Sequence, residues 1–234
     1  MQGLKAPVLT EEQAAPKYNI APTNKTFIVR EYEDQELHDV VRESPDTSER
    51  ELVRLRWGLI PKWAPDTRKP MMNARAETAA SKPTFRDSMK YRRCLVATDR
   101  WYESMELPGS TERKPLKQRI FIRRLGPDGN PVPFFFAGLW SVWRPKEEPN
   151  ATPLETFAIV TREPSPALRV VHDRIPVVLP EELYDSWLDR KMTDANAAAA
   201  LLEFAVMGGF DFHKVSTKSN FAKNEGPDCM EPIK

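Results

Sequence analysis

Three short segments, far apart in the chain, each combine a polar side chain with bulky neighbours. They are residues 73–78, 101–103 and 171–176. Together they offer an amide from Asn73, a carboxylate from Glu103 and an imidazole from His172. Two arginines, Arg75 and Arg174, lie close to these groups in sequence. An amide, a carboxylate and an imidazole beside two cations are the parts of an acid–base site that receives an anionic substrate.

Glu103 and His172 carry the acid–base part of this hypothesis. Glu103 follows two aromatic residues, and burial among rings raises the pKa of a carboxyl group towards neutrality, which suits a proton shuttle. The alternative is an exposed carboxylate at a strand end. An isolated histidine is more often a structural hydrogen-bond partner, but His172 lies among charged residues directly before a predicted strand, which favours proton transfer. His38 and His213 lack such neighbours and are interpreted as surface or packing residues.

Cations and aromatic rings near those segments are candidates for contacts with an anionic substrate. Asn73 is expected to cap a helix over 74–80, and Arg75 offers the forked donors that bind phosphate. Trp63 follows a proline and a lysine in a loop, so an exposed ring on which a base stacks is expected there. The alternation before Trp57 favours a core position for that ring. Weaker candidates for contacts with the backbone of a nucleic acid are Thr161, Lys214, Ser216 and Lys218.

The bulk composition is that of an ordinary globular protein. The 234 residues fit one domain over 1–234, with 40% hydrophobic and 29% charged residues and a net charge of +1. No apolar run approaches the ~20 residues of a membrane span and no signal peptide opens the chain, so a cytoplasmic location is expected. The two cysteines give neither a disulfide framework nor metal-ligand spacing, and no metal or cofactor is predicted. Cys94 is interpreted as a buried small hydrophobe, whereas Cys229 lies in a polar tail.

Many short elements separated by prolines predict an α+β fold around a mainly antiparallel, partly closed, barrel-like sheet with a few short helices. The predicted strands are 27–33, 52–60, 93–98, 118–125, 133–140, 156–161, 175–179 and 212–215. Gly126–Asn130 has the composition of a hairpin turn between two of them. Helices are expected over 180–188 and from a cap at Thr193 to Gly208, with further helical turns in 73–82 and 163–170. The segments 42–50 and 144–154 are expected to be exposed loops.

The segments described above, together with Tyr18–Thr23 and Trp57–Pro61, resemble in order the SOS-response-associated peptidase family, over about Tyr18 to Ile233. That resemblance implies a protein that attaches itself covalently to abasic sites in single-stranded DNA, and also a peptidase activity. It implies that Asn73 and Arg75 bind the sugar and phosphates and that His172 is catalytic. The candidate catalytic residues are therefore Asn73, Glu103 and His172. The candidate DNA-binding residues are Arg75, Trp63, Trp57, Arg174, Thr161, Lys214 and Ser216.

Two positions depart from the family pattern. The family's nucleophile is a cysteine after the initiator methionine, and here that position is Gln2. Either the cysteine is absent or the true start lies upstream, and in both cases this chain is expected not to form the family's stable thiazolidine. The family's tryptophan after the motif glutamate is replaced by Ser104.

Three functions remain open from the sequence. The first is an abasic-site-binding protein that acts as a monomer on single-stranded DNA, with its crosslinking step impaired. The second is a non-catalytic module that binds single-stranded or damaged DNA. The third is a hydrolase that activates water with Glu103 and His172, although no hydroxyl nucleophile with an adjacent base supports it.

Overall fold

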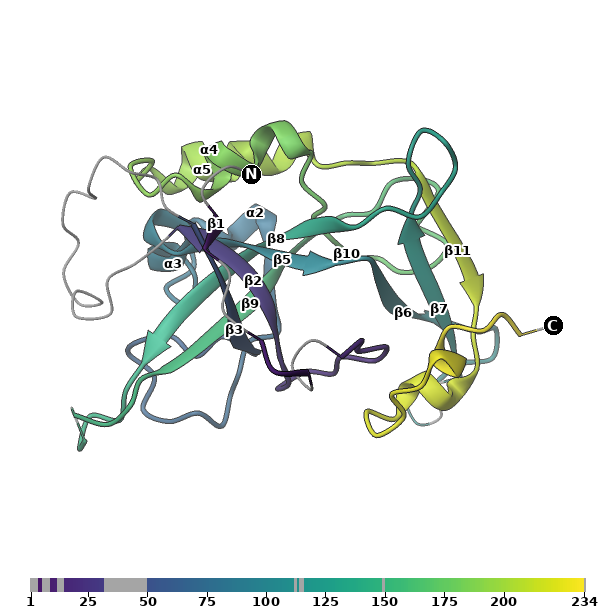
Figure 1. Cartoon of the computed structure of the whole chain (residues 1–234), viewed down its shortest axis with the longest axis horizontal. Coiled ribbons are helices and arrows are strands. Elements are labelled where there is room, and N and C mark those ends of the chain that lie inside the picture. The colour runs from purple at the N-terminus through teal and green to yellow at the C-terminus, as the bar shows by residue number, and fades with distance from the viewer. Residues whose placement is uncertain are drawn as a thin grey trace.

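A closed barrel of five strands lies at the centre of the molecule (Figure 1). The computed structural model describes residues 4–5, 9–11, 15–31, 50–111, 113, 116–148 and 150–233. Around the barrel the strands are β3 (Arg50–Trp57), β2 (Lys25–Glu31), β5 (Arg93–Thr98), β8 (Phe134–Trp143) and β9 (Leu154–Arg162). Neighbours pair antiparallel except where β3 closes the barrel, parallel to β9. The predicted α+β class with a mainly antiparallel, barrel-like core is confirmed.

Three short strands extend this sheet. β10 (Ile175–Pro176) pairs antiparallel with the end of β9, and β4 (Asn73–Arg75) pairs parallel with it. β1 (Leu4–Lys5) pairs parallel with the first two residues of β3, whereas Trp57 is the last residue of β3. At about 3.3 Å per residue, β1 is therefore anchored on the order of 20 Å from the Trp57 end of that strand.

A second sheet of three antiparallel strands stands beside the barrel, in the order β11 (Phe210–Lys214), β7 (Lys117–Arg124) and β6 (Arg100–Glu106) (Figure 1). Trp101 joins the two sheets. Its ring meets Phe134, Phe136 and Phe210 edge to face, with centroids 5.9, 5.7 and 5.4 Å away. Such aromatic contacts add to the free energy gained by burial, so the position of β6 relative to the barrel is well determined.

The central barrel strands are buried on both faces, as the alternation of side chains along β8 shows. Ala137 and Leu139 belong to a core cluster that also holds residues of the helices. Phe136 and Trp140 point the other way, into a second cluster shared with the three-stranded sheet. Gly138 lies on this second side, where an added Cβ would come within 2.8 Å of the Cys94 sulfur, so a side chain does not fit.

Short helices cover the first face of the barrel. They are α2 (Ala76–Ala79), α3 (Arg86–Tyr91), α4 (Tyr184–Leu188) and α5 (Ala195–Leu201), with 3-10 turns at Glu181–Leu183 and Leu202–Phe204. Two further 3-10 turns, Thr217–Asn220 and Pro227–Cys229, lie beside the three-stranded sheet (Figure 1). The buried side chains of α4 and α5, among them Trp187 and Ala198, pack into the first core cluster. The α5 helix begins where Asp194 accepts hydrogen bonds from the backbone N–H groups of residues 196 and 197.

All eight predicted strands have counterparts in the structure, most of them with shifted ends. β5 has the predicted bounds, whereas only Ile175–Pro176 of the strand predicted over 175–179 is formed. The sequence analysis did not predict β1, β4 or β6. The loop between β8 and β9 agrees with the one predicted over 144–154, except that Leu154 begins β9. Of the other predicted loop, 42–49 lies outside the described residues, like His38, whereas Arg50 begins β3 and is buried.

Three local predictions are wrong. Asn73 does not cap a helix: it begins β4, and Arg75 takes the capping position of α2 without a side-chain cap. The cap of α5 is Asp194 rather than Thr193, and the segment 163–170 forms turns but no helix. The hairpin turn predicted at Gly126–Asn130 is confirmed: the Gly126 N–H donates to the Asn130 carbonyl at 2.8 Å, and the Val132 N–H donates to the Arg124 carbonyl at 3.1 Å. Beyond one bridge, β7 and β8 separate into different sheets because each finds other partners.

Candidate functional site

A cleft of about 870 Å³ opens between the barrel and the three-stranded sheet. The segment Lys17–Pro22 and the C-terminal residues Ser219, Asn220 and Ala222 complete its wall. Asn73, Glu103 and His172 all line this cleft, although about a hundred residues separate the first from the last. The fold therefore brings the amide, the carboxylate and the imidazole to one cavity.

The β4 strand explains the positions of Asn73 and Arg75. Side chains alternate along a strand, so these two residues share one face while Ala74, between them, is fully buried on the other. Arg75 lies opposite Thr161 of β9, which in turn lies opposite Pro176 of β10. Arg75 is exposed and, among the described residues, makes no ion pair. The guanidinium is thus available to an anion in the cleft.

Arg174 lines the cleft but is committed to contacts within the protein. Its two terminal nitrogens donate to both carboxylate oxygens of Glu77 at 2.8 Å, and one of them also donates to the Thr161 carbonyl at 2.6 Å. The pair lowers the pKa of the Glu77 carboxyl, chiefly through the hydrogen bonds from Arg174. This arrangement ties the loop that carries His172 to α2 and β9, so Arg174 is a positioning residue.

We predict that Arg174→Ala loosens this loop more than it weakens contacts with an anion. Arg174→Ala and Glu77→Gln are each expected to lower the free energy of unfolding. A double-mutant cycle should give a coupling energy on the order of 1 kcal/mol, since a bidentate pair is stronger than an average surface ion pair. Urea denaturation of the four proteins measures it. Additive effects would show that the two side chains act independently.

His172 is held through one ring nitrogen. Its Nδ1 lies 3.0 Å from both the backbone N–H and the carbonyl oxygen of Arg174, and 2.9 Å from an Asp173 carboxylate oxygen. The backbone of Arg174 can thus donate to a neutral ring or accept from a charged one. No hydrogen bond of Nε2 is formed among the described residues, so this nitrogen can exchange a proton with a molecule in the cleft.

Glu103 has the electrostatic environment of a proton shuttle. Burial raises the pKa of this carboxyl to about 7, and the charges of His172 and Arg119 oppose part of that rise. Near neutral pH the side chain is therefore present in both protonation states, which a general acid–base requires. The sequence analysis expected burial among aromatic rings to raise the pKa of this carboxyl towards neutrality, and the value of about 7 agrees.

Arg119 also lines the cleft, although the sequence analysis did not identify it as a site residue. It lies on β7, donates from Nη1 to the Ser104 hydroxyl at 3.2 Å and places its guanidinium 5.2 Å from the centre of the Tyr102 ring. Burial lowers the pKa of Arg119, and Glu103 opposes the decrease. The serine that replaces the family's tryptophan thus holds a cation beside the acid–base carboxylate.

The other predicted DNA-binding residues divide into two groups. Trp57 and Thr161 line the cleft, with the Trp57 indole donating to the Met72 carbonyl at 2.9 Å. Trp63 is 55% exposed but does not line the cleft. The remaining candidates also lie outside it: Lys214 ends β11, Ser216 caps the turn Thr217–Asn220, and Lys218 pairs with Asp228.

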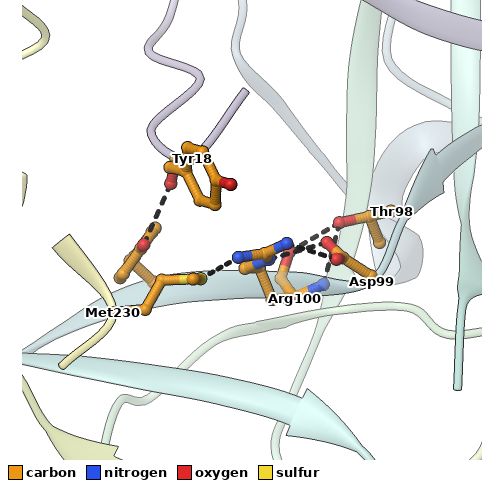
Figure 2. Close-up of polar contacts among 6 residues, drawn as sticks. Tyr18, Thr98, Asp99, Arg100 and Met230 are labelled. Atoms are coloured by element: carbon orange, nitrogen blue, oxygen red, sulfur yellow. Dashed lines mark hydrogen bonds and ion pairs between the residues drawn. The ribbon is translucent and has the colours of Figure 1, made fainter. Parts of the chain in front are cut away.

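The wall formed by the N-terminal and C-terminal segments is fixed by hydrogen bonds. Buried Asn19 donates to the carbonyl oxygens of Phe221 and Asn224 at 3.1 and 3.2 Å. The Tyr102 hydroxyl donates to the Tyr18 carbonyl at 2.9 Å. Figure 2 shows the Tyr18 ring near Arg100, whose side chain extends between Asp99 and Met230. Tyr18 and Asn19 thus join β6 to the C-terminal segment.

The described residues contain no group of acidic, histidine or cysteine side chains arranged to hold a metal ion. Both cysteines are fully buried, and burial raises the pKa of each thiol, so neither has thiolate character. His213 packs against Phe121 with ring centroids 4.8 Å apart, which agrees with a packing role. Gln2 lies outside the described residues. No helix in the described part of the chain is long and apolar enough to cross a membrane.

Comparison with known proteins shows the family of this chain. The family model of the SOS response associated peptidase (SRAP) matches residues 2–221. The chain belongs to this family. Within it, the abasic site processing protein YoqW of Bacillus subtilis is 33% identical over 225 residues, which cover 95% of this chain and 89% of YoqW. The abasic site processing protein HMCES of Gallus gallus is 28% identical over 246 residues, covering 96% of this chain and 68% of HMCES.

Solved structures have the same fold as this chain. A crystal structure of a Bacteroides thetaiotaomicron protein superimposes with a TM-score of 0.63 at 25% identity, covering 78% of this chain and 77% of the other. A phage-related protein from Bordetella bronchiseptica gives a TM-score of 0.61 at 30% identity, with coverage of 85% and 81%.

Proposed function

We propose that this chain processes abasic sites and that it binds single-stranded DNA in the cleft as a monomer. The observation that carries the proposal is the meeting of Asn73, Arg75, Glu103 and His172 in one cavity of an SRAP-family chain. The relatives named as abasic site processing proteins support it.

Each side chain has a role that follows from its chemistry. Arg75 is exposed on the same strand face as Asn73, so its guanidinium binds a phosphate while the Asn73 amide hydrogen-bonds to the sugar. Glu103 and His172 move protons at the sugar carbon, because Glu103 titrates near pH 7 and Nε2 of His172 is available. Trp57 and Thr161 border the same space.

The covalent step of the family is not expected in this chain. The position of the nucleophile is Gln2, and the buried Cys94 and Cys229 do not replace it. We therefore propose non-covalent recognition of the abasic site, accompanied at most by a reversible bond to an amine. A non-catalytic binding module is the alternative, and it differs in having no proton-transfer chemistry at the sugar.

A binding experiment tests the proposal. Fluorescence anisotropy compares a single-stranded oligonucleotide that contains one tetrahydrofuran abasic analogue with the intact strand and with the matching duplex. The analogue lacks the aldehyde, so only non-covalent recognition is measured. Tighter binding of the analogue strand is expected, with an affinity that falls as salt increases. Equal affinity for all three DNAs would end the proposal.

We predict that Arg75→Ala weakens binding of single-stranded DNA and flattens its salt dependence. Loss of one phosphate contact should reduce the slope of log K against log salt by about 0.7 for a single strand. Arg68→Ala is the matched control, because Arg68 is exposed, pairs with Asp66 and lies outside the cleft. An unchanged slope for Arg75→Ala would show that this guanidinium does not contact a phosphate.

A further inference from the structure

The cations that line the cleft are four arginines and one lysine. The arginines are Arg75, Arg100, Arg119 and Arg174. A guanidinium stays protonated in proteins and does not act as a nucleophile. Lys17 is the only lysine among the described residues of the lining, and thus the only side chain there that carries a primary amine. A primary amine can attack a carbonyl carbon, such as the aldehyde of an abasic deoxyribose.

The structure fixes the backbone next to Lys17 and leaves its amine only weakly held. Tyr18 accepts the hydrogen bond from Tyr102, the neighbour of Glu103, and Asn19 is tied to the C-terminal segment. The Lys17 nitrogen pairs with Glu225 at 3.2 Å, and the two side chains are 47% and 38% exposed. A solvent-exposed ion pair of this kind contributes little to stability, so the amine can exchange Glu225 for a ligand.

We propose that Lys17 is a nucleophile of the cleft, whose amine forms a reversible imine with the aldehyde carbon of a ring-opened abasic site. The inference rests on the proposed function, because it requires the abasic sugar to enter the cleft. It adds a residue to the chemistry, since Lys17 belongs to none of the three segments with acid–base groups.

The steps balance with groups that line the cleft. The Lys17 ammonium gives a proton to the Glu103 carboxylate or to the His172 imidazole. The free amine attacks the aldehyde carbon, a C–N bond forms as the C=O π bond breaks, and a proton moves from nitrogen to the resulting alkoxide oxygen, which becomes a hydroxyl group. The protonated Glu103 or His172 then returns its proton to that hydroxyl, which leaves as water while the nitrogen lone pair forms the C=N bond. The products are a protonated imine and water, and hydrolysis reverses the sequence.

Trapping with borohydride tests the proposal. The full chain is mixed with single-stranded DNA that carries a true abasic aldehyde, with and without sodium borohydride, which reduces an imine to a stable amine. We expect a crosslinked band on a denaturing gel only after reduction, and peptide mapping that finds the mass of the reduced sugar on Lys17. Lys17→Arg keeps the positive charge and should lower the yield at least about tenfold. Lys146→Arg, in the exposed loop after β8, is the matched control with unchanged yield.

Binding of the tetrahydrofuran analogue separates the two levels of the proposal. If wild type and Lys17→Arg both prefer the analogue strand and the adduct maps to Lys17, the inference holds. If the preference is present but no adduct forms, or the adduct maps to another amine, the inference is overturned and the proposed function stands. If the analogue is not preferred, the proposed function fails and the inference fails with it.

Discussion

Replacing Gln2 by cysteine is expected to convert this chain from one that gives no heat-stable product with abasic single-stranded DNA into one that does. The wild-type 234-residue chain has no thiol at that position, and its two cysteines are buried. An amine alone forms an imine that water reverses. With the N-terminal methionine removed, the introduced cysteine would present an α-amine and a thiol together. The amine condenses with the aldehyde and the thiol then adds to the C=N bond, closing a thiazolidine ring.

The design controls for removal of Met1, which a small second residue permits and glutamine opposes. Gln2→Ser is the matched variant: it allows the same processing but supplies no thiol. A band that survives heating on a denaturing gel is expected for Gln2→Cys alone. A heat-stable band from the wild-type chain would contradict this account and point to Cys94 or Cys229. No band from a correctly processed Gln2→Cys protein would mean that β1 keeps position 2 away from the cleft.

The fold could be predicted from the sequence where apolar residues give a clear pattern. β5 was predicted with the bounds that the structure has, because an apolar run buried on both faces gives a clear signal. β6 was missed because its charged, aromatic and polar residues follow no regular alternation, and residues 100–104 line the cleft. Asn73 was read as a helix cap because a good helix former follows it, and the pairing of β4 with β9 overrides this local preference.

The sequence could predict which residues belong to the candidate site, but not how the folded chain places them relative to one another. Asn73, Glu103 and His172 were chosen from chemistry and resemblance, and the structure brings them to one cleft. The contribution of Arg119 depends on the pairing of β6 with β7, which no local pattern reveals. Lys17 has no sequence signal of its own, since only the contacts of Tyr18 and Asn19 place it in the wall. The assignment of residues 1–234 to one domain stays a prediction.

Glu103→Gln is expected to change both the chemistry of the cleft and the pH dependence of stability. The amide cannot accept or return a proton, so the rate of borohydride-trapped adduct formation near pH 7 should fall by about 10²–10⁴. Glu106→Gln is the matched control, because Glu106 is exposed at the end of the same strand. Single-turnover gel assays across pH 5.5–8.5 would measure the rates. An unchanged rate would assign the proton transfers to His172 alone.

The stability measurement tests the electrostatic cause independently of DNA. The pKa of Glu103 is about 7 in the folded chain and near its ordinary value of 4.5 when unfolded, so the folded state holds more protons between these two values. Stability contributed by the protonated carboxyl is therefore present below about pH 4.5 and is lost as pH rises through 7. Glu103→Gln lacks this loss, and its stability relative to wild type should rise across that window by on the order of 2–3 kcal/mol. Urea denaturation at several pH values measures the difference. Parallel curves would mean that the carboxylate is solvated, and the argument for a proton shuttle at Glu103 would lose its physical basis.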